Sequence, residues 1–239
     1  MRKVRNVMTN MFYIMRCGGP IIVVFYYLLT IFRYLKNYKK FNAVRVSFQK
    51  KIIGKYRNDW FSNNVPYWEF YVFPHLKGPS LNALEIGSWE GMSAFYMLSS
   101  LPNLDLVCID SWDGSDEHSD LDTTLIEQRF DFNVKPFKNR VKKNKSLSLV
   151  YYSKAKLKGT YDLIYIDGSH YARDVLVDAL YCFDLLNIGG FLIFDDYLWK
   201  FYAKPMNNPA SAVNIFLKFY KKRYKLISVN YQIIIQRVD

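Results

Sequence analysis

Acidic residues stand at or beside the ends of four apolar runs of the sequence. They are Glu85, Asp110, Asp167 and the adjacent pair Asp195-Asp196. In an open α/β sheet the carboxyl ends of parallel strands meet at one edge, and ligands bind there. Strand ends also meet solvent, so a single acid of this kind would carry no weight. Four in succession favour a binding or catalytic site along one rim.

A glycine-bearing turn follows the first of these runs. Gly87 and Gly91 enclose Ser88-Trp89-Glu90, between an apolar run and a segment of helical pattern. Glycine can adopt positive φ and lets a ligand approach closely, and the N-terminus of the next helix presents N–H groups there. The turn lacks the three glycines of the dinucleotide fingerprint. It predicts a site for a nucleotide-like ligand, and the Glu85 carboxylate favours one that carries an amine or a positive charge.

Asp110 lies 23 residues after Gly87, one strand–helix–strand unit along the chain. At this place a carboxylate accepts hydrogen bonds from a ribose diol. The polar residues after it also allow a simple turn or helix-cap role. Trp112 is expected to stack on an adenine ring.

A second group of residues is suited to metal binding and proton transfer. Asp167, Asp195 and Asp196 are hard oxygen donors on strand ends that we expect to be adjacent. Crowded carboxylates repel one another unless a cation lies between them, and Mg²⁺ prefers such ligands. His170 follows Asp167 across the turn Gly168-Ser169. A lone histidine is more often structural, but this position predicts a general base.

Alternating strand and helix patterns are expected to position these residues. Continuous apolar runs separated by helical segments predict an α/β fold with a mostly parallel sheet covered on both faces. The last two strands are close enough to form a hairpin, which adds an antiparallel strand at one edge. Strands are expected at 81–86, 104–109, 140–145, 161–166, 191–194, 226–229 and 232–238, and helices at 91–101, 120–132, 146–157, 171–186 and 208–222. Residues 187–190 are expected to end the helix before them with a glycine cap, and residues 61–80 to form a loop.

These motifs together resemble class I S-adenosylmethionine-dependent methyltransferases. Residues 84–91 (Leu-Glu-Ile-Gly-Ser-Trp-Glu-Gly) look like the first motif of that family, and Cys108-Ile109-Asp110 resembles its ribose-binding acid. Residues 161–170 and 189–197 are similar to the subgroup called methyltransferase family 24, which includes sugar and antibiotic O-methyltransferases.

The resemblance implies a Rossmann-like sheet of seven strands with the last strand antiparallel. It also implies S-adenosylmethionine bound by Glu85, Gly87, Ser88, Gly91, Asp110 and Trp112. In the metal-dependent members, acids of these motifs bind Mg²⁺. Here they are Asp167, Asp195 and Asp196, with His170 as the base and Asp167 beside it at the catalytic centre. The acceptor is expected to be a hydroxyl group of a sugar, a glycan or another small molecule.

The positive charge of the chain is confined to its start. Residues 1–60 hold 13 of the 33 Lys and Arg and one of the 21 Asp and Glu, which accounts for the whole net charge of +12. Residues 61–239 are therefore neutral, which argues against a nucleic-acid groove there. We expect two parts: a basic N-terminal helical extension, residues 1–60, and a methyltransferase domain, residues 61–239.

An unbroken apolar run, Ile21 to Phe32, lies inside the basic extension. Twelve helical residues are too few to cross a bilayer, which requires about 20. Three interpretations stay open: a buried helix of an N-terminal cap, a helix lying in an anionic membrane interface, or a short anchor. Aromatic residues crowd between 60 and 73, where they either close over a ligand pocket or pack the extension onto the domain.

The three cysteines, Cys17, Cys108 and Cys182, show no metal or disulfide spacing and suit a reducing compartment. We therefore expect a cytoplasmic protein that is membrane-associated if the extension binds lipid. Two other functions remain open. One is methylation of an RNA ribose hydroxyl, and the other is a non-catalytic, membrane-tethered protein that keeps the methyltransferase fold.

Overall fold

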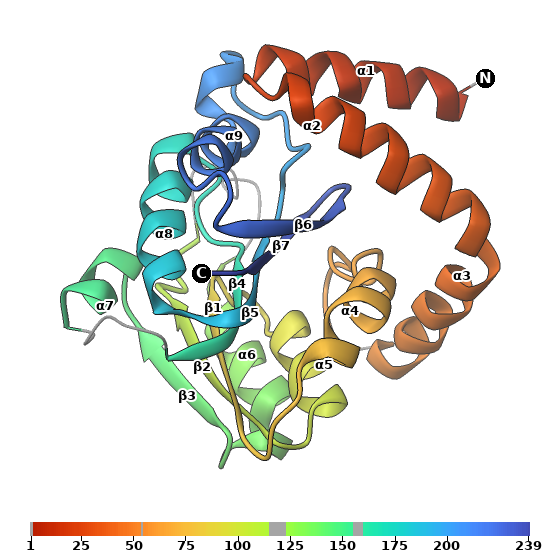
Figure 1. Ribbon diagram of the computed structural model, residues 1–239. Coiled ribbons are helices and arrows are strands. Elements are labelled where there is room, and N and C mark those ends of the chain that lie inside the picture. Colours follow the sequence, from red (N-terminus) through yellow and green to blue (C-terminus); the bar gives the residue numbers. More distant parts are fainter. Residues whose placement is uncertain (1, 54, 115–122, 155–159) are drawn as a thin grey trace.

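A seven-stranded sheet forms the centre of the computed structural model, which describes residues 2–53, 55–114, 123–154 and 160–239 (Figure 1). The strand order is β3-β2-β1-β4-β5-β7-β6. Neighbouring strands from β3 to β5 are parallel, whereas β7 is antiparallel to both β5 and β6. The strands are β1 (Leu81–Ile86), β2 (Leu104–Asp110), β3 (Val141–Lys145), β4 (Tyr161–Ile166), β5 (Leu186–Phe194), β6 (Tyr224–Val229) and β7 (Ile233–Arg237). The predicted mostly parallel sheet with an antiparallel last strand is confirmed.

The register of the central strands brings the acidic residues to one edge of the sheet. Ile86 pairs with Ile109 of β2 and with Ile166 of β4. Ile166 in turn pairs with Phe194 of β5. Because these strands end at the same level, the residues that follow them meet along one rim.

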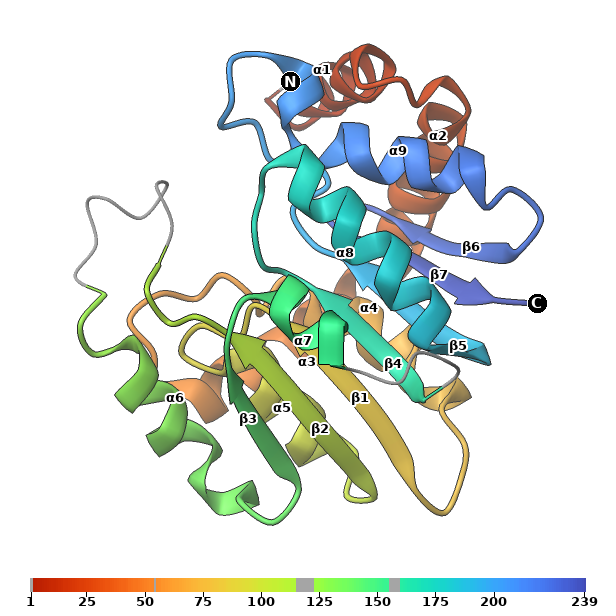
Figure 2. The same ribbon diagram turned by 90° about the vertical axis from the view of Figure 1, so that its left-hand side faces the viewer.

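Helices cover both faces of the sheet (Figures 1 and 2). One face carries α7 (Ser148–Lys154), α8 (Ala172–Leu185) and α9 (Pro209–Phe219), and the other carries α4 (Val65–Tyr71), α5 (Met92–Ser100) and α6 (Ile126–Val134). Short 3₁₀ helices lie between these elements: η2 (Phe73–His75), η4 (Lys135–Phe137) and η5 (Pro205–Asn207). Cover on both faces explains why β1, β4 and β5 read as continuous apolar runs.

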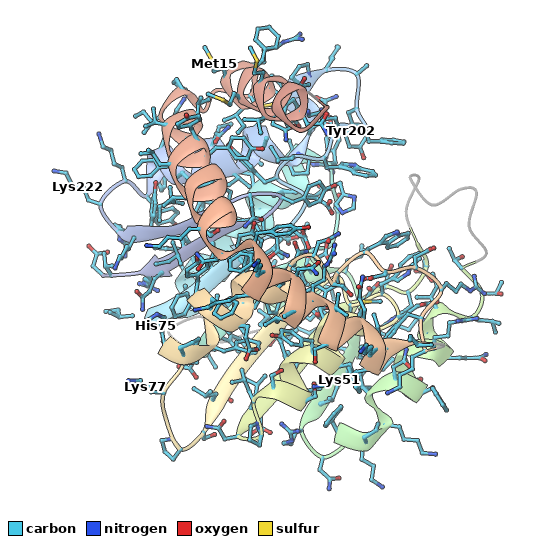
Figure 3. All side chains as sticks on the ribbon, turned by 90° about the vertical axis from the view of Figure 1, so that its right-hand side faces the viewer. Met15, Lys51, His75, Lys77, Tyr202 and Lys222 are labelled. Atoms are coloured by element: carbon cyan, nitrogen blue, oxygen red, sulfur yellow. The ribbon has the colours of Figure 1, made fainter. Side chains whose placement is uncertain are left out.

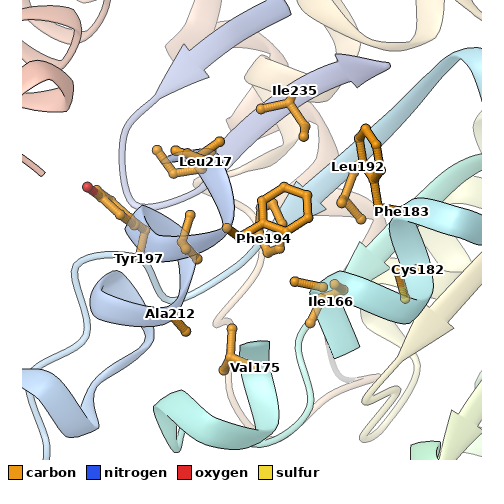
Figure 4. Close-up of a cluster of buried hydrophobic side chains, with 14 of the residues drawn as sticks. Ile166, Val175, Cys182, Phe183, Leu192, Phe194, Tyr197, Ala212, Leu217 and Ile235 are labelled. Atoms are coloured by element: carbon orange, nitrogen blue, oxygen red, sulfur yellow. The ribbon is translucent and has the colours of Figure 1, made fainter. Parts of the chain in front are cut away.

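Each face of the sheet has its own hydrophobic core. Under α8 and α9, Phe194 and Ile166 of the sheet lie near Phe183 and Val175 (Figure 4). Phe183 also meets Phe216 of α9 at a ring distance of 5.5 Å. These fully buried side chains hold α8 and α9 rigidly on the strands whose ends carry the acids.

The N-terminal extension is helical and packs on both layers. It consists of α1 (Arg2–Arg16), α2 (Pro20–Phe25), the π-helical turns η1 (Tyr26–Phe32) and α3 (Arg33–Ile52), the last three without a break. Figure 3 shows this long helix crossing the molecule from the region near Met15 to Lys51. Ile14 and Ile22 are buried in the α8–α9 core and Phe48 in the opposite one. No helix in the described ranges is both long and apolar enough to cross a membrane. The division at residue 60 stays a prediction.

Three local expectations differ from the structure. The segment 61–80, which was expected to be a loop, contains the helix α4, with a proline in its first turn. The prolines and asparagines of this segment are typical of loops, and the helix was therefore missed. Gly189 does not cap α8, because the helix already ends at Leu185 and β5 starts at Leu186. Gly189 instead takes φ +84° within β5, beside a register shift against β4. The helix expected at 120–132 begins at Ile126, and its residues 120–122, like 155–157 of the next expected helix, lie outside the described residues.

Candidate active site

A cavity of about 1040 Å³ opens at the carboxyl ends of β1, β2, β4 and β5. Asp110, Asp167, Asp195 and Asp196 line it, as the strand-end pattern predicted. Residues 56–64, which connect the extension to α4, supply part of its wall. The cavity is of the size that enzymes use for cofactors and small substrates.

The turn after β1 requires its first glycine. Gly87 has φ +83°, and a Cβ added there would lie 2.0 Å from the backbone oxygen of Asp167. The turns that follow β1 and β4 are therefore in direct contact. Gly91 directly precedes α5 and has φ +80°, and its added Cβ would meet the ring of Phe130 at 2.9 Å.

Glu85 supports this turn from below and does not line the cavity. Its buried carboxylate accepts hydrogen bonds from the hydroxyls of Ser88 (2.6 Å) and Ser93 (2.5 Å). Burial raises the pKa of Glu85 to about 7. The expectation that this carboxylate touches the ligand is corrected: strand β1 turns it inward, where it fixes the two serines.

Asp110 faces the cavity, and backbone N–H groups already hold its carboxylate. Oδ2 accepts from Ser88 N and Trp89 N, both at 2.8 Å, and Oδ1 accepts from Trp112 N at 2.7 Å. A carboxylate has about four lone-pair positions. One acceptor position therefore remains on Oδ1, at the place predicted for a ribose hydroxyl.

Trp112 does not lie in the cavity, so its expected stacking on adenine is corrected. Its backbone has φ +56°, and its buried ring packs on Phe130 at 4.9 Å. Its indole N–H donates to the backbone oxygen of Trp89 at 2.9 Å. The aromatic residues that do line the cavity include Trp89 and Trp60, whose rings lie 5.7 Å apart. Trp60 belongs to the aromatic segment that was expected either to close over a pocket or to pack the extension onto the domain. The position of Trp89 in the cavity wall was missed, although it lies inside the glycine turn.

Asp167, His170 and Asp196 meet at the other side of the cavity. Potential ligand atoms of all three lie within 4.8 Å of one another. His170 Nε2 is 2.7 Å from Asp196 Oδ2 and 3.9 Å from Asp167 Oδ1. Burial raises the pKa of Asp167 to about 6, and the neighbouring Asp196 charge acts in the same direction. This arrangement can hold a cation or pass a proton.

Asp195 is separated from that group, which corrects the expected metal ligand set. Its Oδ2 accepts hydrogen bonds from the hydroxyl of Tyr165 and from Gln232 Nε2 (2.8 Å), and Asn64 Nδ2 lies at 3.3 Å. Its Oδ1 accepts from the backbone N–H of Asp196 at 2.7 Å. Burial, together with the Asp167 charge, raises the pKa of Asp195 well above its ordinary value. Asp195 thus orients Asp196 rather than joining it.

Comparison with protein families identifies the domain that carries this site. The profile of the family described as a methyltransferase domain, Methyltransf_24, matches residues 84–197. The chain therefore carries a methyltransferase domain. The matched segment runs from the glycine turn to the residue after Asp196, so it contains Asp110 as well as the group of Asp167, His170 and Asp196. The resemblance drawn from the motifs is confirmed.

Three solved structures illustrate the similarity of this fold to known proteins. A protein of Corynebacterium glutamicum has a TM-score of 0.56 and 16% identity, over 87% of this chain and 97% of that one. The O-methyltransferase of Bacillus cereus in complex with SAH has a TM-score of 0.50 and 18% identity, over 67% of this chain and 75% of that one. The MycE methyltransferase of the mycinamycin biosynthetic pathway, in complex with Mg, SAH and mycinamycin VI, has a TM-score of 0.59 and 13% identity, over 82% of this chain and 54% of that one.

At these sequence identities, the similarity to solved structures shows a shared fold and no shared substrate or mechanism. Among proteins with curated descriptions, no sequence matches this chain.

The donor set of this methyltransferase fits a hard divalent cation. Two carboxylates and one imidazole converge at the cavity wall, and Asp167 is buried enough that its charged form is disfavoured. A cation between Asp167 and Asp196 would relieve both their repulsion and that burial cost. Mg²⁺ is commonly held by one or two carboxylates, with water and substrate as its other ligands. Asp167 and Asp196 would hold the ion, with His170 beside them.

Proposed function

We propose that this methyltransferase uses S-adenosylmethionine to methylate a hydroxyl group of a sugar, a glycan or another small molecule. The observation that carries this proposal is the juxtaposition of two different sites in one cavity. The glycine turn and Asp110 form a nucleoside-binding side. Asp167, His170 and Asp196 form a side suited to activating an oxygen nucleophile.

The donor side suits the nucleoside part of S-adenosylmethionine. The remaining acceptor position on Asp110 fits a ribose hydroxyl, and a charge-assisted hydrogen bond of this kind is among the stronger ones. Trp89 and Trp60 offer ring faces next to it. Supporting this assignment, the fold-sharing B. cereus enzyme and MycE both contain SAH, the demethylated donor.

The acceptor side supplies what methyl transfer to an alcohol requires. The methyl carbon leaves the sulfonium sulfur of the donor and bonds to the acceptor oxygen, which must lose its proton. His170 takes that proton, and the Asp196 carboxylate at 2.7 Å from Nε2 stabilises the imidazolium that results. A divalent cation, when bound by Asp167 and Asp196, supplies a Lewis acid that lowers the pKa of the hydroxyl. The fold-sharing MycE contains Mg in addition to SAH.

Two other functions are less well supported. An RNA ribose acceptor would require a basic groove, whereas residues 61–239, which carry the matched domain, have no net charge. A non-catalytic, membrane-tethered role would leave the acid and histidine group without a function. The Tyr165 hydroxyl donates a hydrogen bond to Asp167, and Asp195 accepts one from the backbone N–H of Asp196, so neighbouring residues hold that group in place.

The basic extension adds a proposed contact with anionic membrane surfaces. Large apolar side chains point outward from α1 and from the α2–η1 segment at helical spacing, so each helix has an apolar outer stripe. Combined with a net charge of +12 in residues 1–60, this composition suits a helix lying in an anionic interface. The exposed side chains are Met8, Phe12, Met15, Ile21, Val24, Phe25 and Leu28.

Transfer of a labelled methyl group tests the proposed reaction. The protein is incubated with labelled S-adenosylmethionine and a panel of glycosides, phenols and RNA, with Mg²⁺ or with EDTA. We expect label in a glycoside or another hydroxyl compound, reduced by EDTA. Label in RNA alone would contradict the choice of acceptor. Full transfer in EDTA would remove the cation from the mechanism and leave His170 as the activating group.

A further inference from the structure

A second cavity, of about 410 Å³, adjoins the active-site cavity. It lies between α3, α4 and the turn that joins β6 to β7. Asn63, Asn64 and Tyr231 line both cavities, so the two spaces share a wall. Its volume is within the range of small-molecule sites.

The lining of the second cavity differs from that of the first. It combines the rings of Tyr38, Phe41 and Tyr67 with the amides of Asn42 and Asn63, and none of its described residues is acidic. A sugar ring has an apolar C–H face and a rim of hydroxyl groups. Aromatic faces beside amides therefore match a saccharide, because rings cover the C–H face while amides donate to and accept from the hydroxyls.

Arg45 is the charged group of this cavity, and its guanidinium is fixed in position. Nη1 donates to Asn63 Oδ1 at 3.1 Å, and Nη2 donates to Asn42 Oδ1 at 2.7 Å. The Nε donor is buried and has no hydrogen-bond partner. Each of the two Nη atoms carries a second N–H donor, and an anionic oxygen is the strongest acceptor for a guanidinium. The nearby exposed lysines of α3, Lys36, Lys39 and Lys40, add positive charge.

Tyr231 connects this cavity to the acid and histidine group. It lines both cavities, and Asp196 belongs to the lining of the first. A chain of sugar residues that fills the second cavity would therefore continue past Tyr231 to Asp196.

We propose that the second cavity is an acceptor subsite for a saccharide that carries an anionic group, either a carboxylate or a phosphate. The anionic residue binds Arg45, and the next residue along presents its hydroxyl at Asp167, His170 and Asp196. This inference rests on the proposed O-methylation and names its acceptor class. It assigns α3 of the N-terminal extension to substrate recognition.

Binding without the methyl donor tests the subsite directly. Ligand-detected NMR is run on the full chain with uronic-acid-containing di- and tetrasaccharides, their carboxyl-reduced neutral forms, and sugar phosphates. We expect the acidic forms to bind more tightly than the neutral ones. Arg45→Met should weaken binding of the acidic forms by about tenfold or more and leave the neutral forms unchanged. Lys51→Met removes the same charge from an exposed position of α3 outside the cavity and should have a much smaller effect.

Three results would overturn the subsite: no binding of any acidic saccharide or sugar phosphate, equal binding of acidic and neutral forms, or equal losses in the two variants. Thermal unfolding of each variant shows that it folds. Methyl transfer separates this proposal from the proposed function. Arg45-dependent binding without methylation of any bound saccharide would keep the subsite and contradict the reaction. For a methylated acidic acceptor, we expect Arg45→Met to raise KM and to leave kcat within about twofold, and an unchanged KM would contradict the subsite alone.

Discussion

Glu85 makes the stability of this protein depend on pH in a way that can be worked out from the structure. Burial raises its pKa from the model-compound value of 4.5 to about 7. The folded state therefore holds a proton that the unfolded state releases between these two values. The stabilisation by this group is fully present below pH 4.5 and is lost as the pH rises through about 7. The difference between these two pKa values corresponds to about 3 kcal/mol.

Glu85→Gln removes this ionisation and keeps the shape of the side chain. The amide can still accept from one of the two serines and donate to the other, so the turn has the partners it needs. Urea unfolding at pH 4.5, 6 and 8, followed by tryptophan fluorescence, gives the free energy of unfolding of both proteins. We expect the difference, variant minus wild type, to rise by about 3 kcal/mol from the lowest to the highest pH.

The other titrating groups are the same in both proteins and cancel in that difference. Glu69→Gln is the matched control, because Glu69 also accepts a hydroxyl hydrogen bond, from Tyr96 at 2.8 Å, but is exposed to solvent. Its difference from wild type should change little with pH. If the free energies of unfolding of Glu85→Gln and wild type changed with pH in parallel, the pKa of Glu85 would not be raised by burial, and the argument would be refuted.

Three further predictions concern the base, the turn and the extension. His170→Ala should lower kcat by about 10²–10⁴ while donor affinity persists, which steady-state kinetics and calorimetry check; unchanged kcat would mean that another group takes the proton. Gly87→Ala should lower the free energy of unfolding more than Gly91→Ala. Both positions need positive φ, but only the Cβ added at Gly87 would meet backbone, the Asp167 oxygen at 2.0 Å. Equal losses in urea unfolding would contradict the close contact of the two turns. Wild type should sediment with anionic vesicles and less so in high salt, and Phe12→Ser with Val24→Ser should reduce this without unfolding the protein, since both side chains are exposed. Equal sedimentation with neutral vesicles would contradict the electrostatic part of that contact.

Hydrophobic patterning predicted the sheet well because the strands are buried on both faces. The strands 81–86 and 161–166 were predicted to the residue. Their apolar runs leave no alternative of similar length, and the glycine or aspartate after each run marks its end. The helix α4 was missed, since its stability comes from tertiary burial of Trp68 and Val65 rather than from helix-forming residues.

The position of site residues along the chain was predictable, but the direction of their side chains was not. Asp195 and Asp196 are adjacent in sequence, and only the buried partners Tyr165 and Gln232 decide which of them lies beside Asp167 and His170. Trp112 has a positive φ and turns under the cavity. A positive φ at a tryptophan cannot be predicted from the sequence.

The second cavity lay beyond prediction for a related reason. Tyr38 and Tyr231 come from opposite ends of the chain and meet only after the extension has packed on α4 and the β6–β7 turn. No spacing rule connects residues that far apart. The orphaned Nε of Arg45 is likewise a property of the packed structure.

Calorimetric titration with S-adenosylhomocysteine tests the central claim most directly, because it needs no knowledge of the acceptor. We expect one molecule to bind per chain. Asp110→Asn should weaken this binding by about tenfold or more, since a single carbonyl oxygen cannot accept from the N–H groups of Ser88, Trp89 and Trp112 and also from a ribose hydroxyl. No binding to the folded wild-type protein, or equal binding to a folded Asp110→Asn variant, would contradict the assignment of this cavity to the methyl donor.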